Sequence, residues 1–333
     1  MISIVVPMYN SERTITTLLD SIYSAMYLPF EIICINDGST DETERTVIEY
    51  QKRHQEVILL NQKNMGPSTA RNRGISKALG EWILFADSDD TYSEEGLKRV
   101  QREIVDNPDS ELFVFSYKEK LTTGDKVIGV NQDEGLPVRD FLEEGYQAAD
   151  YLFVHSVWNK VYKKAIIALT GGFDERIKLG EDAIFNSLYL STVNKVKVCS
   201  TPLYNYFIGG ESLSHDKKDL GEIWDSYLMI YSSISHLLQK YNLYEVDALV
   251  FRNYYFGTIN SYINSHNIDH KDEQTLRMML SNHQWIEKIE YIDDCGGFEK
   301  LIVLLASHRC ISISLLLCKL QRYRRLYRKS DSL

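Results

Sequence analysis

The sequence lacks the cysteine pattern of a disulfide-bonded or zinc-binding protein. Its five cysteines are scattered along 333 residues, are odd in number and include no C-x-x-C pair. Disulfide frameworks and structural zinc sites need cysteines at short, regular spacing. We therefore expect neither feature, and we expect a protein of a reducing compartment, the cytoplasm.

A leader and a long uninterrupted apolar run are also missing. The first ten residues, MISIVVPMYN, contain no basic segment and no small-residue cleavage site, so we expect no signal peptide. Near the other end, the segment 301–320 is strongly apolar, but Arg309 interrupts it. Because a charge in the middle of a bilayer is costly, we expect that this segment does not span a membrane.

Positive charge is scarce except at the end of the chain. The net charge is −10, yet residues 300–329 carry eight basic residues and no acidic one, which leaves −18 on the remainder. An acidic body argues against general nucleic-acid binding. The apolar, basic end predicts an amphipathic helix on an anionic membrane surface. The alternative is a helix that docks on the catalytic domain or on a second copy in a homodimer.

The composition is otherwise that of a folded protein. Hydrophobic residues make up 44% of the chain and charged residues 25%, as in ordinary globular proteins. Short apolar runs at 2–6, 31–35, 57–60 and 82–86 alternate with segments of helical spacing. This alternation predicts an α/β fold with a mostly parallel sheet. Aromatic-rich helical patterns follow beyond about residue 217, and we expect those aromatic residues to pack helix against helix.

Three carboxylates follow the fourth apolar run at once. Asp87, Asp89 and Asp90 stand where that run ends, and open α/β sheets bind ligands at the carboxyl ends of their strands. Neighbouring acids raise one another's pKa unless they share a cation, so we predict a divalent metal ion and a phosphate-bearing substrate. The alternative is an acidic turn that caps a helix beginning near Ser93.

Two more polar clusters follow earlier strands. Segment 36–41 places Asp37 at a strand tip, while Ser39 and Glu42 have capping-box spacing for the next helix. The segment lacks the later Gly and Glu of a calcium loop, so we set calcium aside. In the second cluster, Arg71 lies in the first turns of a predicted helix among small residues, which indicate a close approach of the backbone to another group. An isolated arginine there would otherwise be a solvated surface charge.

Four motifs together resemble the inverting family 2 glycosyltransferases of the GT-A fold. They read Pro7-x-Tyr9-Asn10, Asn36-Asp37-Gly38-Ser39-x-Asp41, Asn64-x-Gly66-x3-Ala70-Arg71-Asn72-x-Gly74 and Asp87-x-Asp89-Asp90. The resemblance implies a Rossmann-like mixed sheet flanked by helices that binds a nucleotide-sugar, with a helical extension after it. The predicted domains are a catalytic domain at 1–215 and a C-terminal helical region at 216–333.

The resemblance also implies a donor site. A nucleotide-sugar, most often a UDP-sugar, would be bound by Pro7, Tyr9, Asn10, Asp37, Asn64, Arg71, Asp87 and Ser88. Tyr9 would stack on the base, Asp37 would accept from the uracil imide and Arg71 would contact a uracil oxygen. Asp87 would lie near the ribose, and Asp89 would ligate Mn²⁺ or Mg²⁺, which stabilises the leaving diphosphate.

The catalytic base is expected in the second half of the domain. Gly180-Glu181-Asp182 resembles the family's Glu-Asp pair, which implies that Asp182 is the base and Glu181 its support. We expect a helix N-terminus to keep Asp182 ionised; the alternative is that both acids merely favour that terminus. The chain departs from many relatives by lacking an arginine after Tyr204-x-Tyr206. His215 could serve instead as a phosphate or metal ligand, or it could simply be exposed.

These observations predict a metal-dependent inverting glycosyltransferase of the hexosyltransferase class. The resemblance implies transfer to a lipid-linked or polysaccharide acceptor in cell-surface polysaccharide synthesis. A nucleotidyltransferase is one alternative, but the Gly-rich, basic triphosphate loop that it needs near residue 10 is absent from the sequence. A catalytically silent donor-binding subunit is the other, and the presence of both Asp89 and Asp182 argues against it.

Overall fold

The computed structural model describes residues 1–148, 151–177, 179–208, 220–264, 270–282, 284–286, 297–307 and 311–330. The chain divides into two compact units, Met1–Leu213 and Ser214–Leu333. The domain boundary that we predict at residue 215 falls within 209–219, outside the described residues. Each unit is described here by itself.

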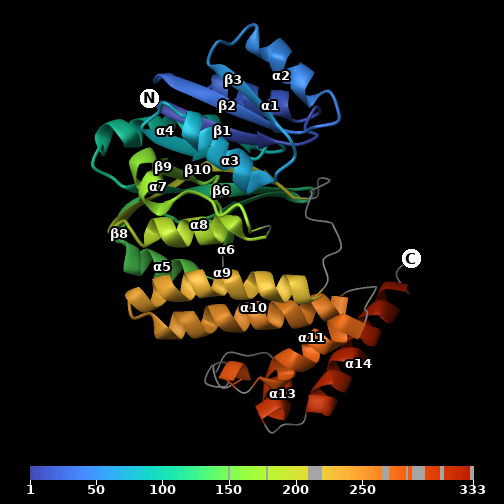
Figure 1. Ribbon diagram of the computed structural model, residues 1–333. Coiled ribbons are helices and arrows are strands. Elements are labelled where there is room, and N and C mark those ends of the chain that lie inside the picture. The colour runs from blue at the N-terminus through green and yellow to red at the C-terminus, as the bar shows by residue number, and fades with distance from the viewer. Residues whose placement is uncertain are drawn as a thin grey trace. The chain divides into compact units, whose positions relative to one another are not determined.

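The first unit begins with four parallel strands in the order β3-β2-β1-β4, of which Figure 1 labels β3, β2 and β1. The strands are β1 (Ile2–Met8), β2 (Phe30–Asp37), β3 (Val57–Gln62) and β4 (Trp82–Phe85). β1 and β4 are buried almost throughout because their uninterrupted apolar side chains meet protein on both faces of the sheet. The apolar run at 2–6 is extended in the structure: β1 continues through Pro7 to Met8, and Pro7 pairs in register with Ile35 of β2.

Helices connect these strands, as the alternation predicts. They are α1 (Ile15–Tyr23), α2 (Thr43–Gln51) and α3 (Pro67–Lys77). The capping box that we expected for α2 is wrong. A capping box needs Ser39 Oγ to accept from the Glu42 backbone N–H, but that N–H donates to Glu12 Oε2 at 2.9 Å, while Ser39 Oγ accepts from the Asn10 backbone N–H at 3.0 Å.

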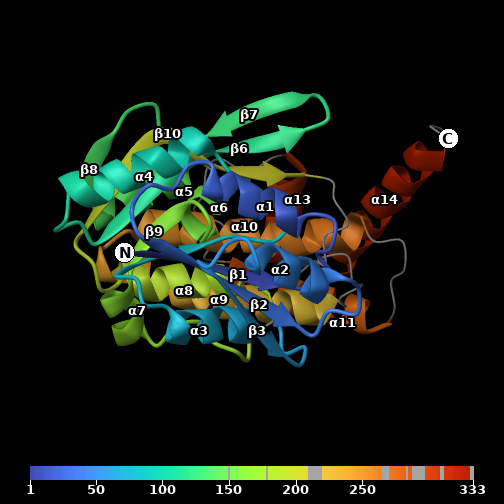
Figure 2. The ribbon, with the colours of Figure 1, turned by 90° about the horizontal axis from the view of Figure 1, so that it is seen from above.

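The second half of the sheet is mixed. β9 (Lys160–Lys163) runs antiparallel to β4 and to β6 (Leu112–Leu121), and β6 runs parallel to β10 (Lys195–Phe207). The remaining strands are β5 (Thr91–Tyr92), β7 (Gly124–Ile128) and β8 (Glu134–Pro137). The helices are α4 (Glu94–Asp106), α5 (Val138–Gln147), α6 (Tyr151–His155), α7 (Lys164–Thr170) and α8 (Glu181–Leu190) (Figure 2). This mixed sheet with flanking helices confirms the predicted fold class.

Helix α4 approaches β10 closely at Gly96. A Cβ atom at Gly96 would lie 2.4 Å from Leu203 Cα and 2.5 Å from the Pro202 carbonyl oxygen, both backbone atoms that cannot move aside alone. We expect Gly96→Ala to lower the free energy of unfolding by about 1–3 kcal/mol through overpacking. Urea denaturation measures this. Gly135→Ala is the matched control, since nothing lies within 4 Å of its Cβ; equal losses in both variants would contradict the close approach.

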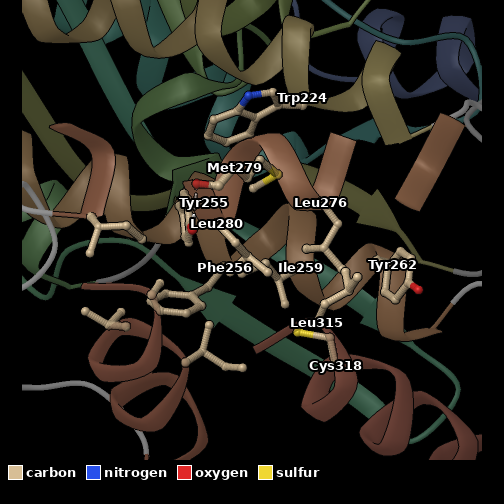
Figure 3. Packing of buried hydrophobic residues seen from close by; sticks show 14 of the residues in the cluster. Trp224, Tyr255, Phe256, Ile259, Tyr262, Leu276, Met279, Leu280, Leu315 and Cys318 are labelled. Carbon is tan, nitrogen blue, oxygen red and sulfur yellow. Dashed lines mark hydrogen bonds between the residues drawn. The ribbon is translucent and has the colours of Figure 1, made fainter. Parts of the chain in front are cut away.

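The second unit is helical. Its helices are α9 (Leu220–Lys240), α10 (Tyr244–Asn264), α11 (His270–Ser281), α13 (Gly297–Ser307) and α14 (Ile311–Ser330). Figure 3 shows Trp224, Tyr255 and Phe256 within an apolar cluster that also contains Leu315 and Cys318 of α14. The aromatic residues therefore pack between helices, as predicted. Among the described residues, no helix is long and apolar enough to cross a membrane.

Candidate active site

The predicted site residues gather where parallel strands end. Asn10 follows β1, Asp37 is the last residue of β2, and Asp87 follows β4. Because these strands are parallel neighbours, their carboxyl ends lie at one edge of the sheet (Figure 2). Helix α3 starts at Pro67 beyond the end of β3, and it presents Arg71 in its second turn.

Arg71 is the centre of this edge. Its Nη2 lies 3.0 Å from Asp87 Oδ1, while its Nη1 lies 3.0 Å from Glu181 Oε1 and 2.9 Å from Asp182 Oδ1. The arginine side chain is only 5% exposed. One guanidinium thus joins the loop after β4 to the N-terminus of α8, and its bonds to Glu181 and Asp182 span 110 and 111 positions of sequence.

Aromatic and amide groups hold Arg71 in place. The Phe173 ring centre lies 5.3 Å from the guanidinium carbon, and Phe173 stacks on Phe185 with ring centres 4.1 Å apart. Asn72 pins the same loop, because its side chain donates to the Phe173 carbonyl and accepts from the Phe173 N–H, both at 2.8 Å. Sequence reasoning missed Phe173; the Asn72 position in the third motif was the available signal.

Asp182 is an acid in a poorly hydrated site. Burial raises its pKa to about 8, and the charges of Glu181 and Asp87 act in the same direction, while Arg71 lowers it. The side chain nevertheless keeps 23% of its surface exposed, so it can be reached by a small molecule. Burial, the largest influence on this pKa, acts against the expectation that the helix N-terminus keeps Asp182 ionised at neutral pH.

Asn186 fixes the helix that carries Asp182. This buried amide donates to the Asp182 carbonyl oxygen at 3.0 Å and accepts from the Tyr162 hydroxyl at 2.8 Å. Buried Lys160 donates to the Phe153 and Ser156 carbonyl oxygens at 2.9 and 2.6 Å in the segment before β9. These contacts hold α8, which carries Asp182, and the segment before β9 in place. No sequence motif predicted them.

Asp37 closes the turn into α3. Its Oδ1 accepts from the Met65 N–H and the Gln62 side chain, and its Oδ2 accepts from the Gly66 N–H, each at 2.8 Å. Gly66 has φ +88°, which a residue with a side chain rarely adopts. With three bonds made, the carboxylate keeps one of its roughly four acceptor positions. Its contact with a uracil imide stays a prediction.

The loops after β1, β2 and β4 are tied together. Asn10 Oδ1 accepts from the Thr40 N–H at 2.8 Å, and Ser88 Oγ lies 2.6 Å from Ser11 Oγ. Pro7 and Tyr9 are half-buried, and Asn10 is exposed. A Cβ atom at Gly38 would lie 2.8 Å from the Asn64 backbone nitrogen, so that loop and the one before α3 are in contact. The base-stacking role of Tyr9 stays a prediction.

The three acids after β4 do not point the same way. Asp90 is buried and its Oδ1 accepts from the Phe207 N–H at 2.8 Å. Burial, followed by the charge of Asp87, raises the pKa of Asp90 to about 8. Asp87 is engaged by Arg71. The expectation that all three share one cation is therefore wrong for Asp90, which instead ties β10 to this loop.

Asp89 is the acid of this loop that can meet a metal ion. It is exposed, although partial burial of its carboxylate and the nearby Asp87 charge raise its pKa. No group of three or more His, Cys, Asp or Glu residues in the described ranges is arranged to hold a metal. A single accessible carboxylate fits Mg²⁺ or Mn²⁺ that takes its other ligands from substrate phosphates and water. His215 lies outside the described residues.

An aromatic stack borders the acids. The Asp87 backbone N–H donates to the Tyr204 hydroxyl at 2.9 Å, and Trp158 stacks on Tyr204 and Tyr206 with ring centres 4.7 and 5.6 Å away. The pKa of Tyr206 is raised, first by burial and then by the charges of Asp90 and Asp87. The stack was not predicted, since the Tyr-x-Tyr spacing alone does not reveal its partner.

Comparison with known proteins places this site in a family. A family model described as "Glycosyl transferase family 2" matches residues 3–159. The protein called EpsH in Bacillus subtilis (strain 168) is 30% identical over 253 residues, which cover 73% of this chain and 71% of EpsH. The chain belongs to glycosyl transferase family 2. This confirms the resemblance carried by the four motifs.

Two other relatives match this family 2 member over a smaller share of their own length. The "Uncharacterized glycosyltransferase EpsJ" of Bacillus subtilis (strain 168) is 31% identical over 216 residues, 64% of this chain and 63% of EpsJ. TarS of Staphylococcus aureus (strain Mu50 / ATCC 700699), a poly(ribitol-phosphate) beta-N-acetylglucosaminyltransferase, is 30% identical over 211 residues, 61% of this chain and 35% of TarS. The chain thus matches less than two thirds of either relative.

Solved structures agree with the fold of this family 2 chain. The structure of S. aureus TarS 1–349 in complex with UDP-GlcNAc superposes with a TM-score of 0.70, covering 97% of this chain and 91% of that one at 21% identity. The complex of the same fragment with UDP gives 0.68 at 19% identity. At this identity the likeness concerns the fold alone.

Proposed function

We propose that this family 2 protein is an inverting, metal-dependent glycosyltransferase that moves a sugar from a UDP-sugar to a polysaccharide or lipid-linked acceptor. Support for the donor comes from TarS, whose solved structures hold UDP and UDP-GlcNAc. Support for the acceptor class comes from the name of TarS, which acts on a poly(ribitol-phosphate). The sugar transferred by this chain is open to experiment.

One observation carries the proposal: Arg71 joins Asp87 at the strand edge to Asp182 at the start of α8. An inverting transfer needs a base on the face of the sugar opposite the leaving diphosphate. Asp182 would take the proton of the acceptor hydroxyl as its oxygen bonds to the anomeric carbon. The bond from that carbon to the diphosphate oxygen breaks at the same time, and UDP leaves with the electron pair.

The remaining residues would bind and orient the donor. Asp37 and Arg71 would recognise the uracil ring of the donor, as the family resemblance implies. Tyr9 would stack on that ring, and Asp87 would lie near the ribose. Asp89 would hold Mn²⁺ or Mg²⁺, which when bound supplies positive charge to the leaving diphosphate. A donor held in this way brings the anomeric carbon toward Asp182, which is the positioning that the reaction needs.

A panel of UDP-sugars tests the proposal. Purified protein is incubated with each donor and with glycan or lipid-linked acceptors, and released UDP is measured with and without EDTA. We expect release from at least one UDP-sugar, lost with EDTA and restored by Mn²⁺ or Mg²⁺. No release from any nucleotide-sugar would favour the silent donor-binding subunit. Release of pyrophosphate from UTP and a sugar phosphate would instead indicate the nucleotidyltransferase.

We also propose that helix α14 lies on an anionic membrane surface, which places the enzyme at the cytoplasmic face of the cell membrane. Ile313, Leu316 and Leu320 recur at helical spacing and are 50%, 54% and 51% exposed, whereas Leu315 and Cys318 on the other side enter the buried cluster. The sequence adds five basic residues and no acid between 322 and 329. Since the rest of the chain is acidic, this basic end is the part that anionic lipid attracts.

Exposed leucines on α14 provide the test. We expect Leu316→Glu with Leu320→Glu to weaken co-sedimentation with phosphatidylglycerol vesicles by about tenfold or more, because apolar burial and charge attraction are both reduced. Leu169→Glu is the control, because Leu169 on α7 of the first unit is 78% exposed. Unchanged vesicle binding would reject the membrane contact. A change in oligomeric state on gel filtration would point to the homodimer.

A further inference from the structure

Arg71 makes more contacts in this structure than recognition of the uracil base requires. Its two terminal nitrogens donate to Asp87, Glu181 and Asp182, all at 3.0 Å or less. A planar guanidinium fork fixes both the distance and the orientation of the carboxylates that it binds. We propose that Arg71 positions Asp182 for proton transfer and couples that base to the donor side of the site. This inference rests on the proposed function.

The arginine itself is rigid enough for this role. Its side chain is 5% exposed, the Phe173 ring lies against its guanidinium, and Asn72 pins the loop that carries Phe173. Its Nε is buried without a hydrogen-bond partner. Leaving a buried donor unsatisfied is unfavourable, so the arrangement keeps its three carboxylate bonds at the expense of one donor. A residue that merely neutralised charge would not need so constrained a place.

The charges around Asp182 explain what Arg71 contributes. The ionisable groups whose charges act on Asp182 come from α3, α8, β9 and the loop after β4, and they are Arg71, Glu181, Lys160, Tyr162 and Asp87. His155 lies on α6, which packs against α8. Burial keeps His155 neutral by lowering its pKa to about 3. Glu181 and Asp87 oppose ionisation of Asp182, whereas Arg71 and then Lys160 favour it. Arg71 is therefore the main group that lets the base ionise.

Arg71→Met tests the proposal through the pH dependence of kcat/KM for transfer. We expect kcat/KM at neutral pH to fall by about 100-fold, as for a misplaced reacting group. We also expect the acidic limb of the profile to move to higher pH by about one pH unit or more, since a neighbouring arginine lowers a carboxylate pKa by that amount. A residue that only contacts uracil would raise the donor KM and leave the limb unmoved, which would overturn the proposal.

Two further variants sharpen the result. Arg71→Lys keeps the charge but not the fork, so we expect its pH limb to stay near wild type while kcat falls. Should the Met variant not fold, Arg71→Lys decides alone: a lower kcat at unchanged donor KM supports positioning, and the reverse pattern overturns it. Arg73→Met is the control on the same helix, because Arg73 donates to the Asn61 carbonyl oxygen at 2.7 Å and contacts neither acid of α8.

Failure of this inference can be told from failure of the proposed function. If wild-type protein releases no UDP from any donor, the proposed function fails. If wild-type protein is active, but in Arg71→Met the acidic limb of the pH profile does not move and kcat is unchanged, only the inference about Arg71 is refuted.

Discussion

Replacing Asp182 with Asn should abolish sugar transfer while leaving UDP binding close to that of wild type. The amide has nearly the same shape as the carboxyl group and can still accept from Arg71, but it cannot take a proton from the acceptor. We expect kcat to fall by about 100- to 10,000-fold, the usual contribution of a general base. Initial rates of UDP release measure kcat, and calorimetric titration with UDP measures binding.

Wild-type activity should also depend on pH as the charge of Asp182 predicts. Because its pKa is raised to about 8, kcat/KM should rise with pH through that value and level off above it. Asp174→Asn is the control, since Asp174 is paired with the exposed Arg176 at 2.7 Å and is not among the acids that Arg71 pairs with in the described residues. An Asp182→Asn enzyme with wild-type kcat would contradict the assignment of Asp182 as the catalytic base.

The same substitution gives a stability readout that does not depend on activity. The unfolded chain releases the Asp182 proton near its ordinary pKa of about 3.9, whereas the folded chain holds it until about 8. Ionising conditions therefore favour unfolding, and this group lowers wild-type stability by at most about 1.4 kcal/mol per pH unit between those values. An Asn side chain does not ionise, so the variant does not lose stability in this way as pH rises. Urea denaturation at both ends of the window should show the variant gaining on wild type as pH rises.

Replacing Asp89 with Asn should remove metal-dependent transfer. A divalent cation held by this carboxylate would stabilise the negative charge on the leaving diphosphate by several kcal/mol. We therefore expect activity to fall by about 100- to 1,000-fold when the carboxylate is lost. Donor binding should also become independent of Mn²⁺, as calorimetric titration of UDP with and without the metal would show.

The neighbouring acid gives a matched control for Asp89. Asp90 is buried and bonds the Phe207 N–H, which an Asn oxygen can also do. We expect Asp90→Asn to keep its metal dependence. If Asp90→Asn lost the metal response and Asp89→Asn kept it, the assignment of the two acids would be reversed.

The sequence predicted the frame of the site better than its contacts. Apolar runs without a polar break, such as 82–86, could be assigned as buried strands, and the acids that follow them had to lie at the sheet edge. Which of two adjacent acids turns inward is decided by Phe207, a residue on a distant strand. No spacing rule could show that Asp89 is exposed and Asp90 buried.

The partners of Arg71 could not be predicted from the sequence for the same reason, since they lie on elements distant in sequence. Motif resemblance singled out Arg71, Asp87 and Asp182 one at a time, and it gave Arg71 a uracil contact. That one guanidinium joins α3, the loop after β4 and α8 follows from the tertiary fold. The capping box at the start of α2 was mispredicted because residues distant in sequence bond its groups: the Asn10 N–H donates to Ser39 Oγ, and the Glu42 N–H donates to Glu12 Oε2.

The stereochemistry of the product tests the central claim most directly. A single displacement assisted by Asp182 converts an α-linked UDP-sugar into a β-linked product, and proton NMR of the newly formed glycoside reads the anomeric configuration. We predict the inverted, β-configured product with every donor that the enzyme accepts. An α-configured product would show retention, and it would contradict the assignment of Asp182 as the base of a one-step transfer.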